Sequence, residues 1–252
     1  MLYVIKIAYD GSGYAGWQRQ INALSVQECL EDAILNALGV DVRVVASGRT
    51  DAGVHAAGQV CHFTADLTIP ANRLPDCLNQ YLPPSIRLLE GWEGQEGFDA
   101  CRSAKRKTYR YRIYEGRREH PLIDAYATRV ETIPTVEKLR SAAKLFEGEH
   151  DFKAFCASGS TAKTTVRTVY SVDVRESQEY GLRVVDIFVT GNGFLYNMVR
   201  TMAGELLDLA SGKRTAESLQ TAYATGDRSL LGKTMAAKGL TMISVEYPTE
   251  KE

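Results

Sequence analysis

The stretch "LYVIKIAYDGSGYAGWQRQ", residues 2–20, joins an alternating apolar run to a glycine-rich loop. Its three glycines spell G-x-G-x-x-G, the phosphate-binding fingerprint of doubly wound nucleotide-binding folds. In that fingerprint the last glycine opens a helix, and an acidic residue about twenty positions further on ends a strand. Here "WQRQ" follows, the next helix begins only near Ser25, and the acids Glu31 and Asp32 fall inside that helix. The stretch therefore predicts a strand and a loop, not a dinucleotide site.

Helix and strand signals alternate irregularly along the rest of the chain. The segment "SVQECLEDAILNALG" predicts a helix that Ser25 and Glu28 cap and Gly39 ends. Further helices are predicted over about 71–81, about 135–147, 192–212 (capped by Asn192 or a neighbour and closed by Gly212) and from about 215. Strands are predicted around Tyr109 and near 42–46, 59–64, 86–92, 165–176, 181–191 and 241–247.

This order of elements has no strict β-α-β rhythm. It therefore favours an α+β fold with a mostly antiparallel sheet over a doubly wound parallel sheet. The second half of the chain is similar in outline to the first. The sequence thus predicts two similar α+β lobes, residues 1–104 and 105–252.

The composition is that of a well-cored soluble protein, with 44% hydrophobic and 24% charged residues among 252. No apolar run approaches the roughly 18 residues that a membrane span needs, and the N-terminus lacks a signal-peptide core. We therefore expect a cytoplasmic protein without membrane association. The five cysteines form an odd set without a C-x-x-C pair, which favours reduced thiols over a disulfide framework or a zinc site.

A basic run stands out from a formal net charge of −1. It lies in "KRKTYRYRIYEGRR", residues 105–118, which contains a single acidic residue. A strand there places Tyr109 and Tyr111 on one face and Arg110 and Arg112 on the other. Tyrosines alternating with arginines favour nucleic-acid binding, because bases stack on aromatic rings while arginines hold phosphates. A solvated basic face is the alternative interpretation.

The loop "SGRTDAGVHAAGQ", residues 47–59, carries the candidate site. Gly48 and Gly53 bracket Arg-Thr-Asp and permit backbone angles closed to other residues. In an extended segment Arg49 and Asp51 point the same way, so the arginine is placed to pair with the carboxylate. Such pairing favours the ionised carboxylate that a nucleophile or a base requires.

Other interpretations of this loop remain open. A structural loop with a turn-forming aspartate is the plainest of them. Asp51 and His55 have the i, i+4 spacing of a metal-binding pair, but no HExxH-type pattern supplies further ligands. No second acid within the motif supports a glycosidase, no G-x-S-x-G elbow occurs, and the four histidines suggest no catalytic triad.

Seven stretches follow one another along the chain in a diagnostic order: "YDGSGYAGWQRQ", "SVQECLE", "SGRTDAGVHAAGQV", "TYRYRIY", "HDFKAF", "GNGFLYNMVRTMAG" and "GLTMISVEY". In this order they resemble the tRNA pseudouridine synthase A (TruA) family, over nearly the whole chain. The resemblance implies a pseudouridine synthase fold with a cleft between the lobes. It also implies isomerisation of uridine to pseudouridine in the anticodon stem-loop of tRNA, at positions 38–40, by a homodimer that uses no cofactor and no metal.

The same resemblance implies roles for individual residues. Asp51 is the expected catalytic residue, whether it attacks the sugar, adds to the base or removes a sugar proton. Tyr109 would stack on the flipped base, Leu240 would pack against the uracil, and Arg200 would pair with Asp51 from the other half. Arg49 is the expected substrate-binding neighbour of Asp51. The plain alternatives are core roles for Tyr109 and Leu240 and a solvated helix position for Arg200.

One position departs from the family pattern. The family usually has an arginine shortly after the Phe-x-Ala of "FDACRSAK", where this chain has Cys101. Arg102 follows but would face the other way in a strand. We expect Cys101 to be an inert substitution that affects one phosphate or site contact and not the reaction.

Two alternative functions are compatible with parts of the sequence. A non-catalytic RNA-binding protein would keep the basic aromatic strand, but binding alone would not require Asp51. A synthase that acts on rRNA or mRNA is the rival within the same class.

Overall fold

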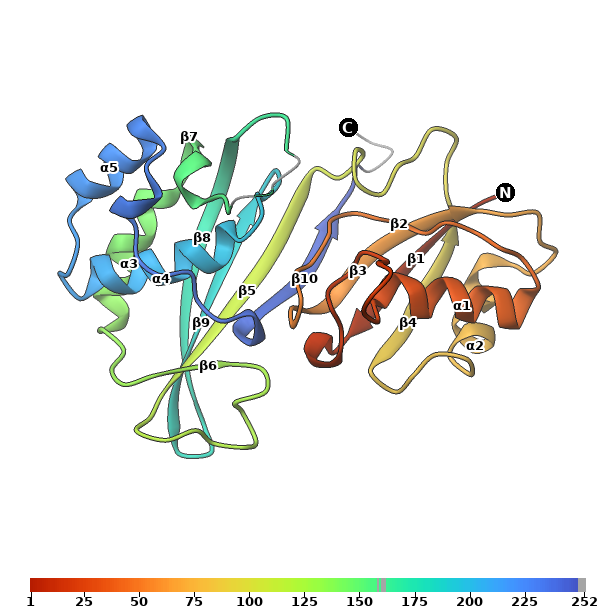
Figure 1. The fold of residues 1–252 in the computed structure, drawn as a ribbon, viewed down its shortest axis with the longest axis horizontal. Helices are drawn as coiled ribbons and strands as arrows, with labels where there is room; N and C mark the ends of the chain where they lie inside the picture. The colour runs from red at the N-terminus through yellow and green to blue at the C-terminus, as the bar shows by residue number, and fades with distance from the viewer. Residues whose placement is uncertain (158, 160–161, 249–252) are drawn as a thin grey trace. The chain divides into compact units, whose positions relative to one another are not determined.

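The computed structural model describes residues 1–157, 159 and 162–248, which divide into two compact units (Figure 1). The first unit holds Met1–Lys105 and the segment from Thr241 onward, and the second unit holds Arg106–Leu240. The two expected lobes, 1–104 and 105–252, differ from this division mainly because the segment from Thr241 onward belongs to the first unit.

The last strand joins the first unit. β10 (Leu240–Glu246) runs parallel to β3 (His55–Thr64), with Thr241 opposite His55. The two strands approach closely at Gly58, where a Cβ atom would lie 2.5 Å from the carbonyl oxygen of Ile243. The sequence pattern shows that 241–247 is extended but not which strand it pairs with, so the expected lobe 105–252 includes this strand.

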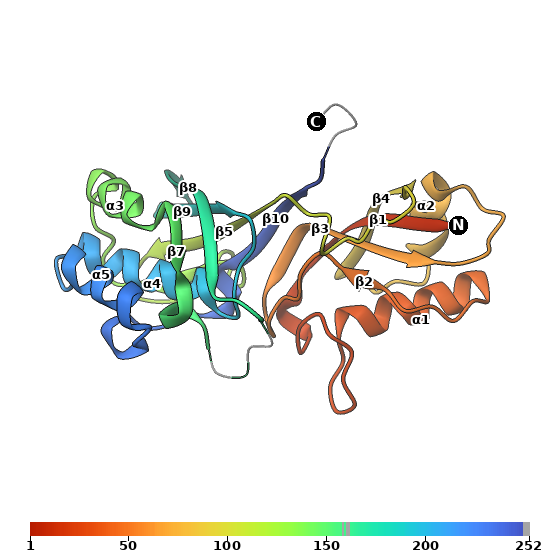
Figure 2. The ribbon, with the colours of Figure 1, turned by 90° about the horizontal axis from the view of Figure 1, so that it is seen from above.

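The sheet of the first unit has the strand order β4-β1-β3-β10. β1 (Leu2–Tyr9) pairs antiparallel with β3 on one side and with β4 (Ile86–Glu93) on the other. The short β2 (Val45–Ala46) adds to β3. Among its described residues the unit also holds the α-helices α1 (Val26–Leu38) and α2 (Leu74–Leu78), and Figure 2 shows α1 along one face of the sheet.

The ends of α1 confirm the expected cap at Ser25 and the expected end at Gly39. The side chain of Ser25 accepts a hydrogen bond from the backbone N–H of Glu28 at 3.3 Å. Gly39 ends the helix with a φ of 70°, a conformation that glycine adopts at little cost. Both caps depend on residues within one turn of the helix, which is why the sequence predicts them.

Other boundaries in this unit differ from the prediction. The helix expected over 71–81 is a 3-10 turn, Ala71–Arg73, followed by the short α2. The amide of Asn79 donates to the carbonyl of Leu88 and accepts from its N–H, both at 2.9 Å, so the chain leaves the helix and docks on β4. β3 begins at His55, before the expected 59, because pairing with β1 extends it.

The sheet of the second unit is antiparallel through the strand order β5-β9-β8-β7. Its strands are β5 (Arg106–Glu115), β9 (Leu182–Gly191), β8 (Val166–Glu179) and β7 (Gly148–Asp151), with β6 (Thr128–Val130) parallel to β5. Pairing in both units is mostly antiparallel. The prediction of an α+β fold is confirmed.

The α-helices in the described part of the second unit are α3 (Val136–Ala143), α4 (Met198–Ala210) and α5 (Ala216–Thr225). A 3-10 turn, Lys144–Phe146, continues α3 over most of the range expected for it. No helix in the described part of the chain combines the length and the apolar character needed to cross a lipid bilayer.

α4 begins at Met198, five residues later than a helix capped by Asn192 would begin. Asn197 precedes the helix with a φ of 64° and makes no side-chain cap. Phe194 packs its ring against Tyr109 on β5 instead of entering a helical turn. The side chain of Phe194 is thus used by a contact with the sheet, which the local pattern does not reveal.

Candidate active site

Asp51 lies in a loop, residues 47–53, that core contacts of the first unit hold in place. The hydroxyl groups of Tyr9 and Thr50 are hydrogen bonded to each other at 2.8 Å. Burial raises the pKa of Tyr9, which keeps this hydroxyl neutral. The backbone N–H of Trp17 donates to the carbonyl of Thr50 at 3.0 Å. The residue directly before Asp51 is therefore fixed, while Asp51 itself is half-buried.

The glycine-rich loop approaches the Asp51 loop too closely for side chains. A Cβ atom on Gly11 would lie 2.0 Å from the carbonyl oxygen of Val54, and one on Gly16 would lie 2.6 Å from that of Thr50. Gly16 also has a φ of +96°, which favours glycine. Gly13, by contrast, has no heavy atom within 4 Å of such a Cβ. Two of the three glycines in the G-x-G-x-x-G pattern therefore serve the packing of the Asp51 loop.

The start of the loop is tied to β3. The side chain of Ser47 donates to the amide oxygen of Gln59, and the amide nitrogen of Gln59 donates to the carbonyl of Gly48 at 2.7 Å. The N–H of Ser47 donates to the carbonyl of Val60 at 2.8 Å. Both Ser47 and Gln59 are fully buried. The loop is thus anchored on both sides of its exposed Arg49.

His55 connects β3 to the glycine-rich loop. It is buried, its Nδ1 accepts a hydrogen bond from the N–H of Gly11 at 3.0 Å, and the same atom lies 3.2 Å from the carboxylate of Asp10. The sequence pattern also pairs His55 with Asp51 as possible metal ligands. Among the residues that the structure describes, no group of three or more His, Cys, Asp or Glu side chains is arranged to hold a metal ion.

Tyr109 and Tyr111 lie on the buried face of β5, as the alternation predicts. The ring of Tyr109 is 7% exposed and meets that of Phe194 edge to face, with 5.2 Å between centroids. The hydroxyl of Tyr111 donates to the carbonyl of Ala236 at 2.8 Å and lies 2.6 Å from the hydroxyl of Thr128. Tyr109 is therefore held on a rigid strand with its ring orientation fixed.

Arg200 lies in the first turn of α4, with its guanidinium held by neighbouring groups. Its Nε donates to the carbonyl of Met235 at 2.7 Å, and its Nη1 donates to the side-chain oxygen of Asn197 at 2.6 Å. The N–H of Met235 donates in return to the carbonyl of Arg200 at 3.2 Å. Arg200 is therefore an ordered, half-buried arginine and not a solvated one. Asn197 lies in the "GNGFLYNMVRTMAG" stretch without a role assigned from the sequence, and Met235 lies outside all of the quoted motifs.

Residues 232–236, which we call the α4 strip, pack against the face of α4 that carries Arg200, Thr201 and Glu205. The carboxylate of Glu205 accepts from the N–H of Gly232 at 2.6 Å, and the hydroxyls of Thr201 and Thr234 are 3.0 Å apart. Glu205 is fully buried, and this burial raises its pKa. The strip is thus fixed by polar contacts that only the folded chain brings together.

The α4 strip also leads to Leu240. Gly204 lets the strip lie directly on α4, since a Cβ there would be 2.0 Å from the carbonyl oxygen of Lys233. A 3-10 turn, Ala237–Gly239, follows the strip, and Leu240 comes next with 6% exposure. One segment of chain therefore orients Arg200 at one end and positions Leu240 at the other.

The basic run is divided between structural and exposed roles. Arg112 forms two parallel hydrogen bonds with the carboxylate of Asp186, at 2.7 and 2.8 Å, and lies 3.1 Å from Glu179. These acids lie far from Arg112 in the sequence, so the sequence of the run does not show that the charge of Arg112 is already paired. Arg106, in contrast, is exposed, with its guanidinium 5.1 Å from the ring centre of Tyr170.

Cys101 lies in a turn rather than a strand. The N–H groups of Cys101 and Arg102 both donate to one carboxylate oxygen of Asp99, at 2.9 and 2.8 Å. The expectation that Arg102 faces away because of strand alternation is therefore wrong. Both side chains are exposed in a turn that Asp99 closes.

The structure distributes the predicted site residues between the two units. Arg49 and Asp51 lie in the first unit, and Tyr109, Arg200 and Leu240 lie in the second. In each unit the candidates are held by specific contacts: the Asp51 loop by the glycine-rich loop and β3, and Arg200 and Leu240 by the α4 strip.

Comparison with known proteins identifies the relatives of this chain. A family model described as "tRNA pseudouridine synthase" matches residues 5–90 and 142–248. A protein called "tRNA pseudouridine synthase A" from Syntrophotalea carbinolica is 42% identical over 96% of this chain and 94% of its own length. The protein of the same name from Caldicellulosiruptor bescii is 38% identical over 97% of this chain and 98% of its own length.

Solved structures give a more distant match. A chain in "Crystal structure of the archaeal box H/ACA sRNP Nop10-Cbf5 complex" is 14% identical, with a TM-score of 0.37. The match covers 81% of this chain and 43% of that one.

Proposed function

Because the chain belongs to the tRNA pseudouridine synthase family, we propose that it isomerises uridine to pseudouridine in the anticodon stem-loop of tRNA, at positions 38–40. The reaction breaks the bond between N1 of uracil and C1′ of the ribose, turns the base and joins C5 to C1′. The uracil stays in the pocket as a delocalised anion, so a strong general acid is not required. One carboxylate suffices for such a scheme.

Asp51 is the catalytic carboxylate in this proposal. The observation that carries it is the construction of the loop: a half-buried acid directly follows Thr50, whose hydroxyl and carbonyl are both hydrogen bonded to buried aromatic residues. A carboxylate on a fixed loop keeps its oxygens in one place, which a covalent or proton-transfer step requires. Arg49 is the neighbouring substrate contact.

Three residues of the second unit complete the site in this proposal. Tyr109 stacks on the flipped base, Leu240 packs against the uracil, and Arg200 pairs with Asp51. Flipping a base out of its stack costs a few kcal/mol, so a pocket must replace that contact and exclude water. The fixed ring of Tyr109 and the anchored guanidinium of Arg200 support these roles, because neither group has to be ordered when RNA binds.

The homodimer expected from the resemblance and the cytoplasmic location expected from the composition belong to the same proposal. Mapping pseudouridines in RNA from cells with and without this gene tests the function directly. Loss of pseudouridine in the anticodon arm of tRNA supports the proposal. Loss confined to rRNA or mRNA, or no loss at all, contradicts it.

We expect Lys105 and the first two residues of β5, of which Lys105 and Arg106 are exposed and Lys107 is half-buried, to contribute to RNA affinity. Replacing Lys105, Arg106 and Lys107 with alanine should weaken tRNA binding and flatten its salt dependence, because fewer counterions are released from the phosphates. The measurement is a titration of tRNA at several salt concentrations. An unchanged slope would show that these side chains form only a solvated face.

We expect the activity to need no dissociable metal or nucleotide. The isomerisation transfers no electrons and consumes no energy source, so activity should survive dialysis against a strong chelator. Assays with and without added zinc or magnesium on the dialysed enzyme, using refolded tRNA in a fixed buffer, test this. Activity that returns only at stoichiometric metal would contradict the Asp51 scheme.

A further inference from the structure

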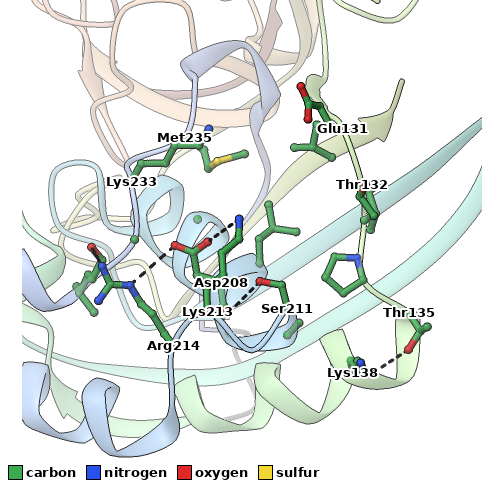
Figure 3. A pocket seen from close by; sticks show the side chains of 18 of the residues that line it. Glu131, Thr132, Thr135, Lys138, Asp208, Ser211, Lys213, Arg214, Lys233 and Met235 are labelled. Atoms are coloured by element: carbon green, nitrogen blue, oxygen red, sulfur yellow. Dashed lines mark hydrogen bonds and ion pairs between the residues drawn. The ribbon is translucent and has the colours of Figure 1, made fainter. Parts of the chain in front are cut away.

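A cavity of about 900 Å³ lies in the second unit and includes none of the five site residues of the proposed reaction (Figure 3). Three segments line it: residues 129–135 with Lys138 of α3, residues 204–214 from α4 onward, and residues 231–235. We call this cavity the basic groove.

Basic side chains outnumber acidic ones in the basic groove. The basic residues are Arg129, Lys138, Lys213, Arg214 and Lys233, and the acidic ones are Glu131 and Asp208. All three lining segments contribute a basic residue. Figure 3 shows Lys213 and Arg214 beside Asp208, and Lys138 and Lys233 on other parts of the lining.

One of these basic residues belongs to the wall of the groove. Arg214 donates to the carbonyls of Leu230 and Leu231, and its Nε lies 3.5 Å from Glu205 and 3.9 Å from Asp208. Its charge is largely balanced by these acids, and it serves to hold the segments together. We assign it no role in binding.

The exposed lysines provide the charge that a ligand would meet. Lys138, Lys213 and Lys233 are all exposed, and only Lys213 is near an acid, with its Nζ 4.0 Å from Asp208, among the described contacts of these three. They come from three different segments. Cations contributed by several segments along one open groove suit the repeated charges of a nucleic-acid backbone, whereas a small anion is bound best by donors that converge on one point.

We propose that the basic groove binds the sugar-phosphate backbone of the tRNA substrate. This inference rests on the proposed function, because it takes the bound RNA to be the molecule that is modified. The RNA would then have two electrostatic contact surfaces on the protein, the basic groove and the start of β5. Phosphate contacts of this kind set the position of the RNA and carry no sequence information.

The groove shares a wall with the α4 strip. Met235 and Lys233 line the groove, and the carbonyl of Met235 accepts the hydrogen bond that orients Arg200. RNA held at Lys233 therefore contacts the same segment that positions Arg200. This gives the groove a means of setting the register of the RNA relative to that arginine.

The test compares a double variant with a matched control. Lys138→Gln with Lys233→Gln removes two groove charges, and Lys144→Gln removes one exposed charge from the turn after α3 without touching the groove. The dissociation constant of full-length tRNA is measured for each protein at several salt concentrations. We expect the double variant to bind about tenfold more weakly and its salt slope to fall by roughly two, with the control unchanged.

Three outcomes are informative. Equal affinity and equal slope in the double variant and the control would overturn the groove proposal. If the double variant binds RNA as tightly as the wild-type protein, and the wild-type protein also binds inorganic pyrophosphate tightly, the groove is a small-anion site and the proposal is overturned. If the wild-type protein binds and isomerises no tRNA, the proposed function fails instead, so the two failures are distinguishable. Thermal unfolding of each variant confirms that affinities are compared between folded proteins.

Discussion

Asp51→Asn should abolish pseudouridine formation while tRNA binding persists. Asparagine has nearly the shape of aspartate and keeps hydrogen bonding, but it carries no charge and is a far poorer nucleophile or base. We expect activity to fall at least about 10³-fold, which corresponds to about 4 kcal/mol of activation barrier. Affinity for tRNA should stay similar or rise slightly, because a negative charge near the phosphate backbone is removed.

The measurement combines two assays on the same protein. Tritium release from C5-labelled uridine in a tRNA transcript reports the reaction, and a binding titration reports the complex. Wild-type activity in the variant would remove Asp51 from the mechanism. A parallel loss of binding and activity would instead indicate a structural aspartate that shapes the loop at 47–53.

The second large effect concerns Gly11, which lies outside the proposed chemistry. A methyl group there would lie 2.0 Å from the carbonyl oxygen of Val54, so either the glycine-rich loop or the Asp51 loop must move. Such overpacking against backbone costs about 3 kcal/mol. For a protein of this size, that cost lowers the melting temperature by roughly 6–12 °C. We also expect Gly11→Ala to lose most of its activity, because the loop that carries Asp51 is displaced.

Gly13→Ala is the matched control, since the same methyl group there would have no heavy atom within 4 Å. Its melting temperature and activity should stay close to those of the wild type. Calorimetry and the tritium assay on both variants distinguish the two positions. Equal behaviour of the two variants would show that the approach of the loops is not tight and that the glycine pattern has another purpose.

The sequence predicts best where structure depends on near neighbours. The caps of α1 use Ser25, Glu28 and Gly39, which lie within one turn of each helix end. The alternation in β5 gives the buried side of Tyr109 and Tyr111, because side chains alternate across any strand. The motifs also indicate the family, which the comparisons confirm.

Long-range contacts explain the first two of the following failed predictions, and a local turn explains the third. The partners of Arg112 lie 67 and 74 positions away, so the basic run alone overstates the charge available to phosphates. α4 starts late because Phe194 packs on the sheet. The turn at Cys101 depends on one carboxylate that accepts two backbone hydrogen bonds, which alternation rules do not anticipate.

The sequence by itself determined the α+β class through local periodicity, and its motifs indicated the family through their resemblance to known relatives. The candidate residues are what that resemblance implies. Only the tertiary structure decided how those residues are held. Met235 reaches Arg200 across 35 positions, and Gly11 meets Val54 through a backbone contact that its lack of a side chain permits. The physical reason is that packing and hydrogen bonding act through space. The distance along the chain therefore says little about which groups meet, and a glycine reveals its purpose only when the atoms around it are known.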